Sequence, residues 1–258
     1  MPDLDPNRVQ LCGPLVIRFG GIDIAGSIRG AQGRAVFAYL LLNRSRRVTR
    51  GELSEALWGP APPAEDAVAI RALLSKLRTV LKNTGAASLP AGESVRLFVT
   101  PEPRVDIEEA VQALHNAQSA VSRGQDVRAW IASHIALNIS SRTFLEGDDG
   151  PWLATRRTAL QELRLRALEA LSACALRLDG PELATAERAA RELVRLAPFR
   201  ESGHAQLMRT LAATGNLAEA ILAYDQLRIL LREELGIPPA PELQALHTEL
   251  LRKPGTMR

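Results

Sequence analysis

Apolar residues recur with a helical period over three stretches between residues 29 and 83, and the third stretch carries the clearest pattern. At about 100° per residue, one arc of residues 68–83 holds Ile70, Leu73, Leu74, Leu77, Val80 and Leu81. The opposite side holds small or uncharged residues, with cations at its edges: Val68, Ala72, Ser75 and Thr79, flanked by Arg71, Arg78 and Lys82 on one side and Lys76 on the other. A narrow strip with cationic edges suits a helix lying in the DNA major groove. An ordinary amphipathic helix with a solvated face gives the same spacing, so both interpretations stay open.

Two further helices precede this one. The first is predicted over residues 31–43 and buries Phe37 and Leu40, and the second begins at Thr49-Arg50-Gly51-Glu52. The T-x-x-E spacing is a capping box, in which the threonine oxygen and the glutamate carboxylate satisfy each other's backbone amides. Gly59-Pro60 ends the second helix.

Strand patterns lie on both sides of these helices. Apolar residues occupy odd positions from Val9 to Phe19, which predicts a small antiparallel sheet at the amino end. Residues 88–89 and 94–99 flank the turn 90–93, which predicts a hairpin. Three helices followed by a hairpin form a winged helix, and Arg96 on the wing is a candidate for the minor groove or a phosphate. A plain surface position for Arg96 is the equal alternative.

The two prolines of Thr100-Pro101-Glu102-Pro103 predict a boundary between domains 1–103 and 104–258. The second domain is predicted to be all-α, with helices at about 106–123, 126–139, 151–178, 182–196, 200–213, 217–235 and 241–252. Leu176 and Gly180 recur 35 residues later as Leu211 and Gly215, a tetratricopeptide-like spacing. An unspecialised helical bundle is the alternative. The predicted fold class is mainly α: an N-terminal winged helix, then an all-α tetratricopeptide-like domain.

Charge is concentrated where the three helices lie. The whole chain carries +3, whereas residues 29–82 hold 10 basic and 4 acidic residues, a net charge of +6 that suits a polyanion. Cys12 and Cys174 are far apart, so neither a structural disulfide nor a metal site is expected, and a reducing cytoplasm fits. Neither a membrane span nor a signal peptide is expected from the apolar runs or from the acidic start.

No motif for catalysis or cofactor binding is present. The sequence has no phosphate-binding glycine loop, no G-x-S-x-G and no H-E-x-x-H. The four histidines are scattered, and Asp148-Asp149 is interpreted as loop charge. We therefore expect no enzyme activity, no cofactor and no metal.

The order of these parts resembles the Streptomyces antibiotic regulatory protein family of transcriptional activators, in which an OmpR-like winged helix precedes a bacterial transcriptional activation domain. The segments that carry the resemblance cover nearly the whole chain: 11–15, Arg34, 48–53, 56–59, 75–78, Leu81, 105–106, 151–152, 204–208, Gly215, Ala220, Tyr224, 234–237 and 241–243.

The resemblance implies binding to direct repeats of double-stranded DNA near a promoter by two protomers side by side. It also implies recruitment of RNA polymerase holoenzyme, including its sigma factor, to antibiotic or other secondary-metabolite genes. The third helix would read the bases, Arg34, Thr49 and Arg50 would contact the backbone, and Arg96 would belong to the wing. Val68 stands where a polar residue is common in the family, which would favour a thymine methyl.

The leading hypothesis is a DNA-binding activator in the cytoplasm, at the nucleoid. Because the sequence ends shortly after the helical part, we expect an activator without an attached sensor domain. The alternative is a tetratricopeptide-type adaptor or ligand-responsive regulator that acts by protein contact without direct DNA binding.

Overall fold

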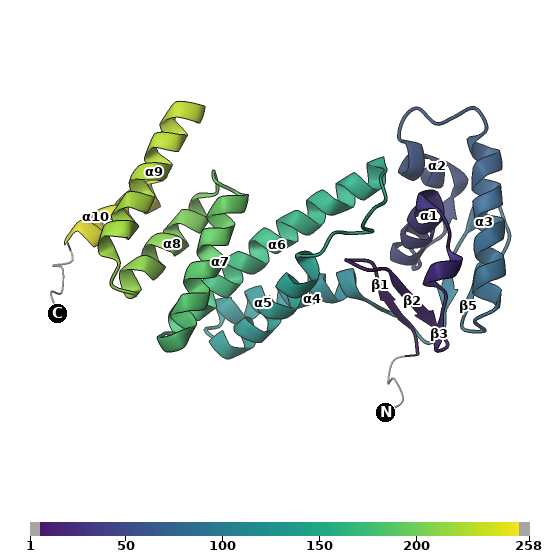
Figure 1. Ribbon diagram of the computed structural model, residues 1–258, viewed down its shortest axis with the longest axis horizontal. Helices are drawn as coiled ribbons and strands as arrows, with labels where there is room; N and C mark the ends of the chain where they lie inside the picture. The colour runs from purple at the N-terminus through teal and green to yellow at the C-terminus, as the bar shows by residue number, and fades with distance from the viewer. Residues whose placement is uncertain (1–5, 253–258) are drawn as a thin grey trace. The chain divides into compact units, whose positions relative to one another are not determined.

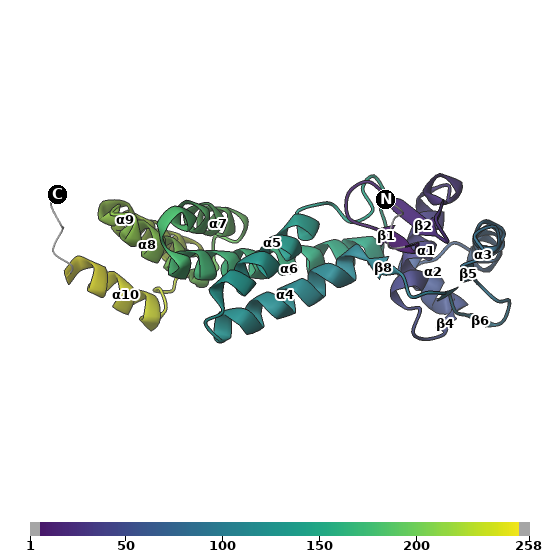
Figure 2. The same ribbon diagram turned by 90° about the horizontal axis from the view of Figure 1, so that it is seen from below.

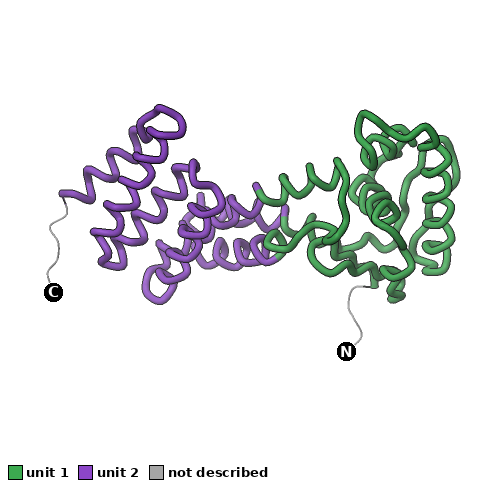
Figure 3. Tube along the Cα trace, turned by 45° about the horizontal axis from the view of Figure 1, so that its top comes forward, with its two compact units in different colours: residues 1–110, 139–161 green, residues 111–138, 162–258 purple. Residues whose placement is uncertain are grey.

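The computed structural model describes residues 6–252, so most of the segment on which the signal-peptide expectation rests lies outside the described residues. The chain divides into two compact units (Figure 3). The first contains the residues up to 110 and residues 139–161, and the second contains residues 111–138 and the residues from 162 onward. Helices α4 (Asp106–Ser122), α5 (Asp126–Ser140) and α6 (Pro151–Leu178) contribute to both units.

The first unit combines short strands with one 3-10 helix and three α-helices of its own, besides its parts of α4, α5 and α6 (Figure 1). Its strands are β1 (Arg8–Gln10), β2 (Val16–Phe19), β3 (Ile22–Asp23), β4 (Val48–Thr49), β5 (Ala87–Ser88), β6 (Ser94–Val95), β7 (Phe98–Val99) and β8 (Arg104–Val105). Its helices are η1 (Ala25–Ser27), α1 (Ala31–Leu42), α2 (Arg50–Trp58) and α3 (Asp66–Lys82).

The amino-terminal sheet has the strand order β3-β2-β1-β8. Strands β1 and β2 are antiparallel with Val9 opposite Ile17, and these side chains are buried, as the alternation predicts. Strand β8 pairs parallel to β1 with Val105 beside Val9, and the sequence pattern did not predict it. Two residues directly after a proline are too short for a period-2 signal.

The wing differs from the predicted hairpin. Residues 94–99 form two short strands instead of one: β6 pairs with β4, with Val95 opposite Val48, and only β7 pairs with β5. The break falls at Arg96 and Leu97, because the Arg96 Nε donates to the backbone oxygen of Arg44 at 2.8 Å while Leu97 is buried.

Residues between α5 and α6 belong to the first unit. The backbone N–H of Gly13 donates to the Thr143 oxygen at 2.8 Å, and that of Leu145 donates to the Leu11 oxygen at 2.8 Å. The Asp106 carboxylate at the start of α4 accepts the Leu11 backbone N–H at 2.9 Å. The boundary at residue 103 stays a prediction, and these contacts tie later residues to the amino-terminal strands.

The second unit is helical. Besides its parts of α4, α5 and α6, it contains η2 (Gly180–Glu182), α7 (Leu183–Leu196), α8 (Glu201–Ala213), α9 (Leu217–Leu235) and α10 (Pro241–Arg252). Consecutive helices α7, α8 and α9 pack on one another, and α10 contacts both α8 and α9 (Figure 2). The mainly α class with a small amino-terminal sheet and a helical domain is confirmed. No helix among residues 6–252 is both long and apolar enough to cross a membrane.

Two contacts show how closely these helices approach. Gly203 on α8 is buried against α7, and a Cβ at this position would lie 2.9 Å from the Cγ of Leu193. Tyr224 and His247 stack with their ring centroids 4.0 Å apart, which joins α9 to α10. Small residues at a crossing and aromatic pairs along it suit a helical-hairpin array.

Candidate nucleic-acid interface

Helix α3 buries the apolar face that the sequence predicts. Ile70, Leu74, Leu77 and Leu81 are buried in the core of the first unit. The helix begins at Asp66, whose carboxylate accepts the Ser54 hydroxyl of α2 at 2.5 Å and lies at the positive end of the helix dipole. The start of α3 is therefore fixed to α2 by a charge-assisted hydrogen bond.

The opposite face of α3 is exposed. Val68, Ala72, Ser75 and Thr79 all lie there, and we call these four residues the α3 strip. Val68 is 57% exposed, a large exposure for an apolar side chain. Arg71, Lys76 and Lys82 are exposed as well, so the strip is bordered by cations. This arrangement leaves small side chains where close approach is needed and long cations where phosphates would lie.

Arg78 and Arg96 are half-buried and bind backbone oxygens of the first unit. The Arg78 Nε donates to the Leu89 oxygen at 3.0 Å, which joins α3 to the wing, residues 87–99. Arg96 donates to Arg44 and also lies over the Phe98 ring, 5.0 Å from its centroid. Both side chains position the wing in addition to carrying charge.

The predicted capping box at the start of α2 is present. Thr49 accepts the Glu52 backbone N–H at 3.2 Å, and the Glu52 carboxylate accepts the Thr49 backbone N–H at 2.8 Å. The hydrogen bond from Thr49 and the ion pair with Arg46 lower the pKa of the Glu52 carboxyl. The neighbouring Arg50 donates through Nη2 to the Gly92 oxygen at 3.3 Å, so the first turn of α2 lies beside the wing turn.

Arg34 contacts a different part of the first unit. Its guanidinium forms a bidentate ion pair with Asp148, with Nε 2.6 Å from Oδ2 and Nη2 bound to Oδ1. The hydrogen bonds that it donates to Asp148 raise the pKa of the Arg34 guanidinium. Asp148 and Asp149 both lie in the loop before α6, as interpreted, but the Asp148 side chain is only 1% exposed, whereas that of Asp149 is fully exposed.

The structure thus brings most of the predicted residues together. The α3 strip and its bordering cations form one surface. Arg78 joins α3 to the wing through Leu89, and Arg50 joins the start of α2 to the wing through Gly92. Arg34 instead engages the segment between α5 and α6. For a phosphate to bind Arg34, it would have to share the guanidinium with Asp148.

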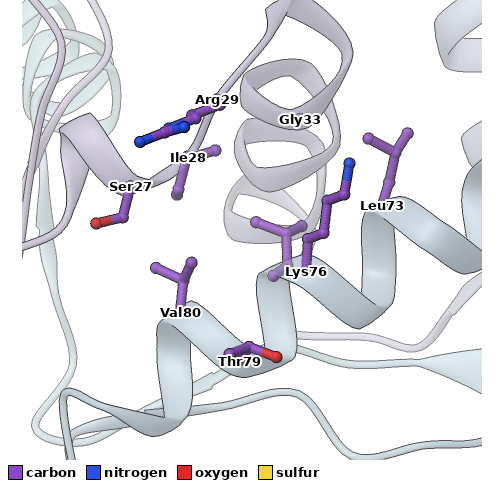
Figure 4. A pocket seen from close by; sticks show the side chains of 9 residues that line it. Ser27, Ile28, Arg29, Gly33, Leu73, Lys76, Thr79 and Val80 are labelled. Carbon is purple, nitrogen blue, oxygen red and sulfur yellow. The ribbon is translucent and has the colours of Figure 1, made fainter.

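Sequence reasoning did not single out Arg29. The structure places it with Lys76 at the edge of a hollow between α3 and the turn that precedes α1 (Figure 4). Its position directly before Gly30, the residue that caps α1, is the sequence signal that could have drawn attention to it. Within residues 6–252, no three histidine, cysteine or acidic side chains gather as they would around a metal ion.

Comparison with known proteins identifies the family. Residues 105–251 match the bacterial transcriptional activator domain. Regulatory protein AfsR of Streptomyces coelicolor is 37% identical over 224 residues, 86% of this chain and 22% of that protein. AfsR of Streptomyces griseus is 33% identical over 96% of this chain and 25% of that protein. The chain therefore spans about a quarter of these relatives.

A shorter relative and a solved structure are also similar to this chain over nearly its whole length. Regulatory protein DnrI of Streptomyces peucetius is 27% identical over 97% of this chain and 94% of its own length. The structure of Mycobacterium tuberculosis EmbR in complex with a low-affinity phosphopeptide superposes with a TM-score of 0.81 at 25% identity, covering 96% of this chain and 65% of that one. The match over residues 105–251 and these relatives show that the chain belongs to the Streptomyces antibiotic regulatory protein family, with a bacterial transcriptional activator domain.

Proposed function

We propose that this protein is a transcriptional activator that binds direct repeats of double-stranded DNA near promoters and recruits RNA polymerase holoenzyme through its sigma factor. The observation that carries the proposal is the exposed α3 strip with cations on both borders. Small side chains allow close approach to base edges, while Arg71, Lys76 and Lys82 reach phosphates on either side.

Each predicted contact takes a part in this proposal. The α3 strip reads the bases, with Val68 set against a thymine methyl. Thr49 and Arg50 present the first turn of α2 to the DNA backbone, where helix amides favour a phosphate. Arg34, Arg78 and Arg96 are already bound within the first unit, so we assign them to holding its parts in place as well as to adding positive charge.

The helical part supplies the second surface. Val127, Ile131 and Ile135 on α5 recur every four residues, and their side chains are 62%, 56% and 47% exposed. Apolar side chains on one helix face favour contact with another protein. This stripe supports polymerase recruitment, and it equally supports the alternative, an adaptor that acts without DNA.

Relatives named as regulatory proteins support a role in transcription, and their Streptomyces hosts support control of antibiotic or other secondary-metabolite genes. Domain boundaries at 103 and 104, two protomers side by side on the DNA, and a place in the cytoplasm at the nucleoid belong to the same proposal.

In-vitro selection from a random duplex pool with the full chain tests the proposal. We expect selected duplexes that contain a short sequence motif twice, in the same orientation and about one helical turn apart, because two recognition helices then lie on the same face of the duplex. A retained pool with the composition of the input would exclude sequence-specific binding by this chain. In that case, a polymerase pull-down with Ile131→Asp as the control variant decides whether the adaptor alternative holds.

A further inference from the structure

A hollow of about 450 Å³ lies between α3 and the turn that leads into α1. It is lined by Ser27, Ile28, Arg29, Gly33, Leu73, Lys76, Leu77, Thr79 and Val80, all within the first unit. This volume falls within the range of small-molecule sites, which runs from about 300 to 1,000 Å³.

The inner wall of the hollow is apolar. Ile28 and Leu77 are buried at 4% and 3% exposure, and Leu73 and Val80 are half-buried beside them. Gly33 on α1 contributes no side chain, and a Cβ there would meet only the Cγ2 of Ile28 at 3.7 Å. A glycine at this position therefore keeps space open that a larger residue would fill.

The edge of the hollow is cationic. Figure 4 shows Arg29 projecting from the turn before α1 and Lys76 from α3, with Ile28 and Val80 near them. Both cations are exposed, and no carboxylate lines the hollow. Helix α1 begins just beyond Arg29 with no side-chain cap and no acidic residue in its first turn, so its dipole adds positive potential.

We propose that this hollow binds a small organic anion, an apolar molecule that carries one carboxylate. The apolar body packs against Ile28, Leu77 and Val80, and the carboxylate lies between Arg29 and Lys76. An inorganic phosphate would leave the apolar wall uncovered, and a neutral apolar molecule would leave both cations unused. Apolar burial and two charge-assisted hydrogen bonds are both needed for a good fit.

Occupancy has a consequence for DNA binding that rests on the proposed function. Lys76 borders the α3 strip and also lines the hollow, so one ammonium group serves both a phosphate and the carboxylate. A bound anion also adds negative charge beside the groove-facing helix. The ligand and DNA therefore compete, and by linkage each weakens the other by the same factor.

Binding is tested first on the full chain without DNA, by calorimetry with octanoate as the probe and with octylammonium and acetate as comparison compounds. We expect saturable binding of octanoate and none of the other two. Lys76→Gln and Arg29→Gln should each weaken the affinity for octanoate about tenfold, as the loss of one charged hydrogen bond predicts. Lys82→Gln removes an exposed cation of α3 that does not line the hollow, and it should leave the affinity unchanged.

Filling the hollow separates a built site from simple charge attraction. Gly33→Leu places a side chain inside it and should abolish octanoate binding while both cations remain. Ser27→Trp covers the hollow from an exposed position and serves as a second test should Gly33→Leu fail to fold. Unchanged octanoate affinity in the folded variants, or equal binding of octylammonium, would overturn the proposal.

Competition between the ligand and DNA is measured in a separate experiment, by titrating octanoate into a complex of the protein with a selected duplex. Release of DNA that depends on Gly33 supports competition, and DNA retained at saturating octanoate overturns the competition while leaving the site in place. If no duplex is selected at all, the proposed function fails, but calorimetry on the protein alone still decides whether the anion site exists.

Discussion

Asp148 accepts two hydrogen bonds from the guanidinium of Arg34, and its carboxylate is almost fully buried in the first unit. The pair joins α1 to the segment between α5 and α6. Replacing Arg34 by alanine should lower the free energy of unfolding by about 3 kcal/mol, because a buried carboxylate loses its cation. Urea denaturation measures this change.

The double variant Arg34→Ala/Asp148→Ala is the matched test of this pair. We expect it to be less destabilised than the sum of the two single variants, since no uncompensated charge remains. Strictly additive losses would show that the two side chains do not act together in solution.

Cations on the border of α3 should bind phosphates irrespective of sequence. Arg71→Gln and Lys76→Gln should weaken binding to selected and random duplexes alike. Each should reduce the slope of log affinity against log salt by about 0.9. Fluorescence anisotropy at several salt concentrations measures the slope, with Arg123→Gln, at an exposed position in the turn after α4, as control. A wild-type slope in both α3 variants would remove these residues from the interface.

Residues of the α3 strip should instead determine which sequence is preferred. Val68→Asn exchanges an apolar contact for an amide, so the base preferred at one position of the selected DNA motif should shift from thymine toward adenine. A repeat of the selection with this variant shows the shift. Identical motifs from both proteins would place Val68 away from the bases.

Replacing two helical glycines by alanine should change the stability of the protein in opposite directions. Gly203→Ala puts a methyl group 2.9 Å from the Leu193 Cγ and should cost about 1–3 kcal/mol through overpacking. Gly33→Ala meets only an ordinary contact and should stabilise by about 0.5 kcal/mol, because the unfolded chain loses freedom. Thermal unfolding of both variants measures the contrast, and equal shifts would contradict the packing at α7 and α8.

His204 should make stability depend on pH. Burial lowers the pKa of its imidazole below the ordinary value of 6.5, while Nε2 donates to the Pro198 oxygen at 2.9 Å. Below pH 6.5 the unfolded chain therefore binds a proton that the folded chain does not, so stability falls as the pH falls, by at most about 1.4 kcal/mol per pH unit. Denaturation between about pH 7 and pH 5 measures this decline.

Glutamine at this position keeps a donor near the Nε2 site and cannot be protonated. His204→Gln should flatten the pH profile, whereas His115→Gln, at an exposed position on α4, should leave it unchanged. An equally steep profile in the His204 variant would assign the decline to other groups.

Residues that begin or end helices explain why the helices could be predicted. Pro151 and Pro241 begin α6 and α10 as first helical residues, and Gly236 ends α9 in the left-handed conformation. The exposed side of α3 followed from its period alone. Such signals depend on neighbours a few residues apart, which a sequence displays directly.

Long-range pairings are the part that the sequence could not reveal. The split of the wing depends on Val95 lying opposite Val48, and the burial of Asp148 depends on Arg34, 114 residues earlier. No periodicity encodes a partner at that distance. The hollow beside Lys76 was missed for the same reason, since its walls come from η1, α1 and α3.

The hydrogen bond from Leu145 to Leu11 also sets an order in time. Synthesis proceeds from the amino end, so Leu11 cannot form this hydrogen bond until Leu145 has been made. By then all of α5, a helix shared with the second unit, has also been made. A nascent chain stopped at residue 103 has neither β8 nor the carboxylate for Arg34. The first unit, which carries the α3 strip, is thus completed only after more than half of this sequence has been made.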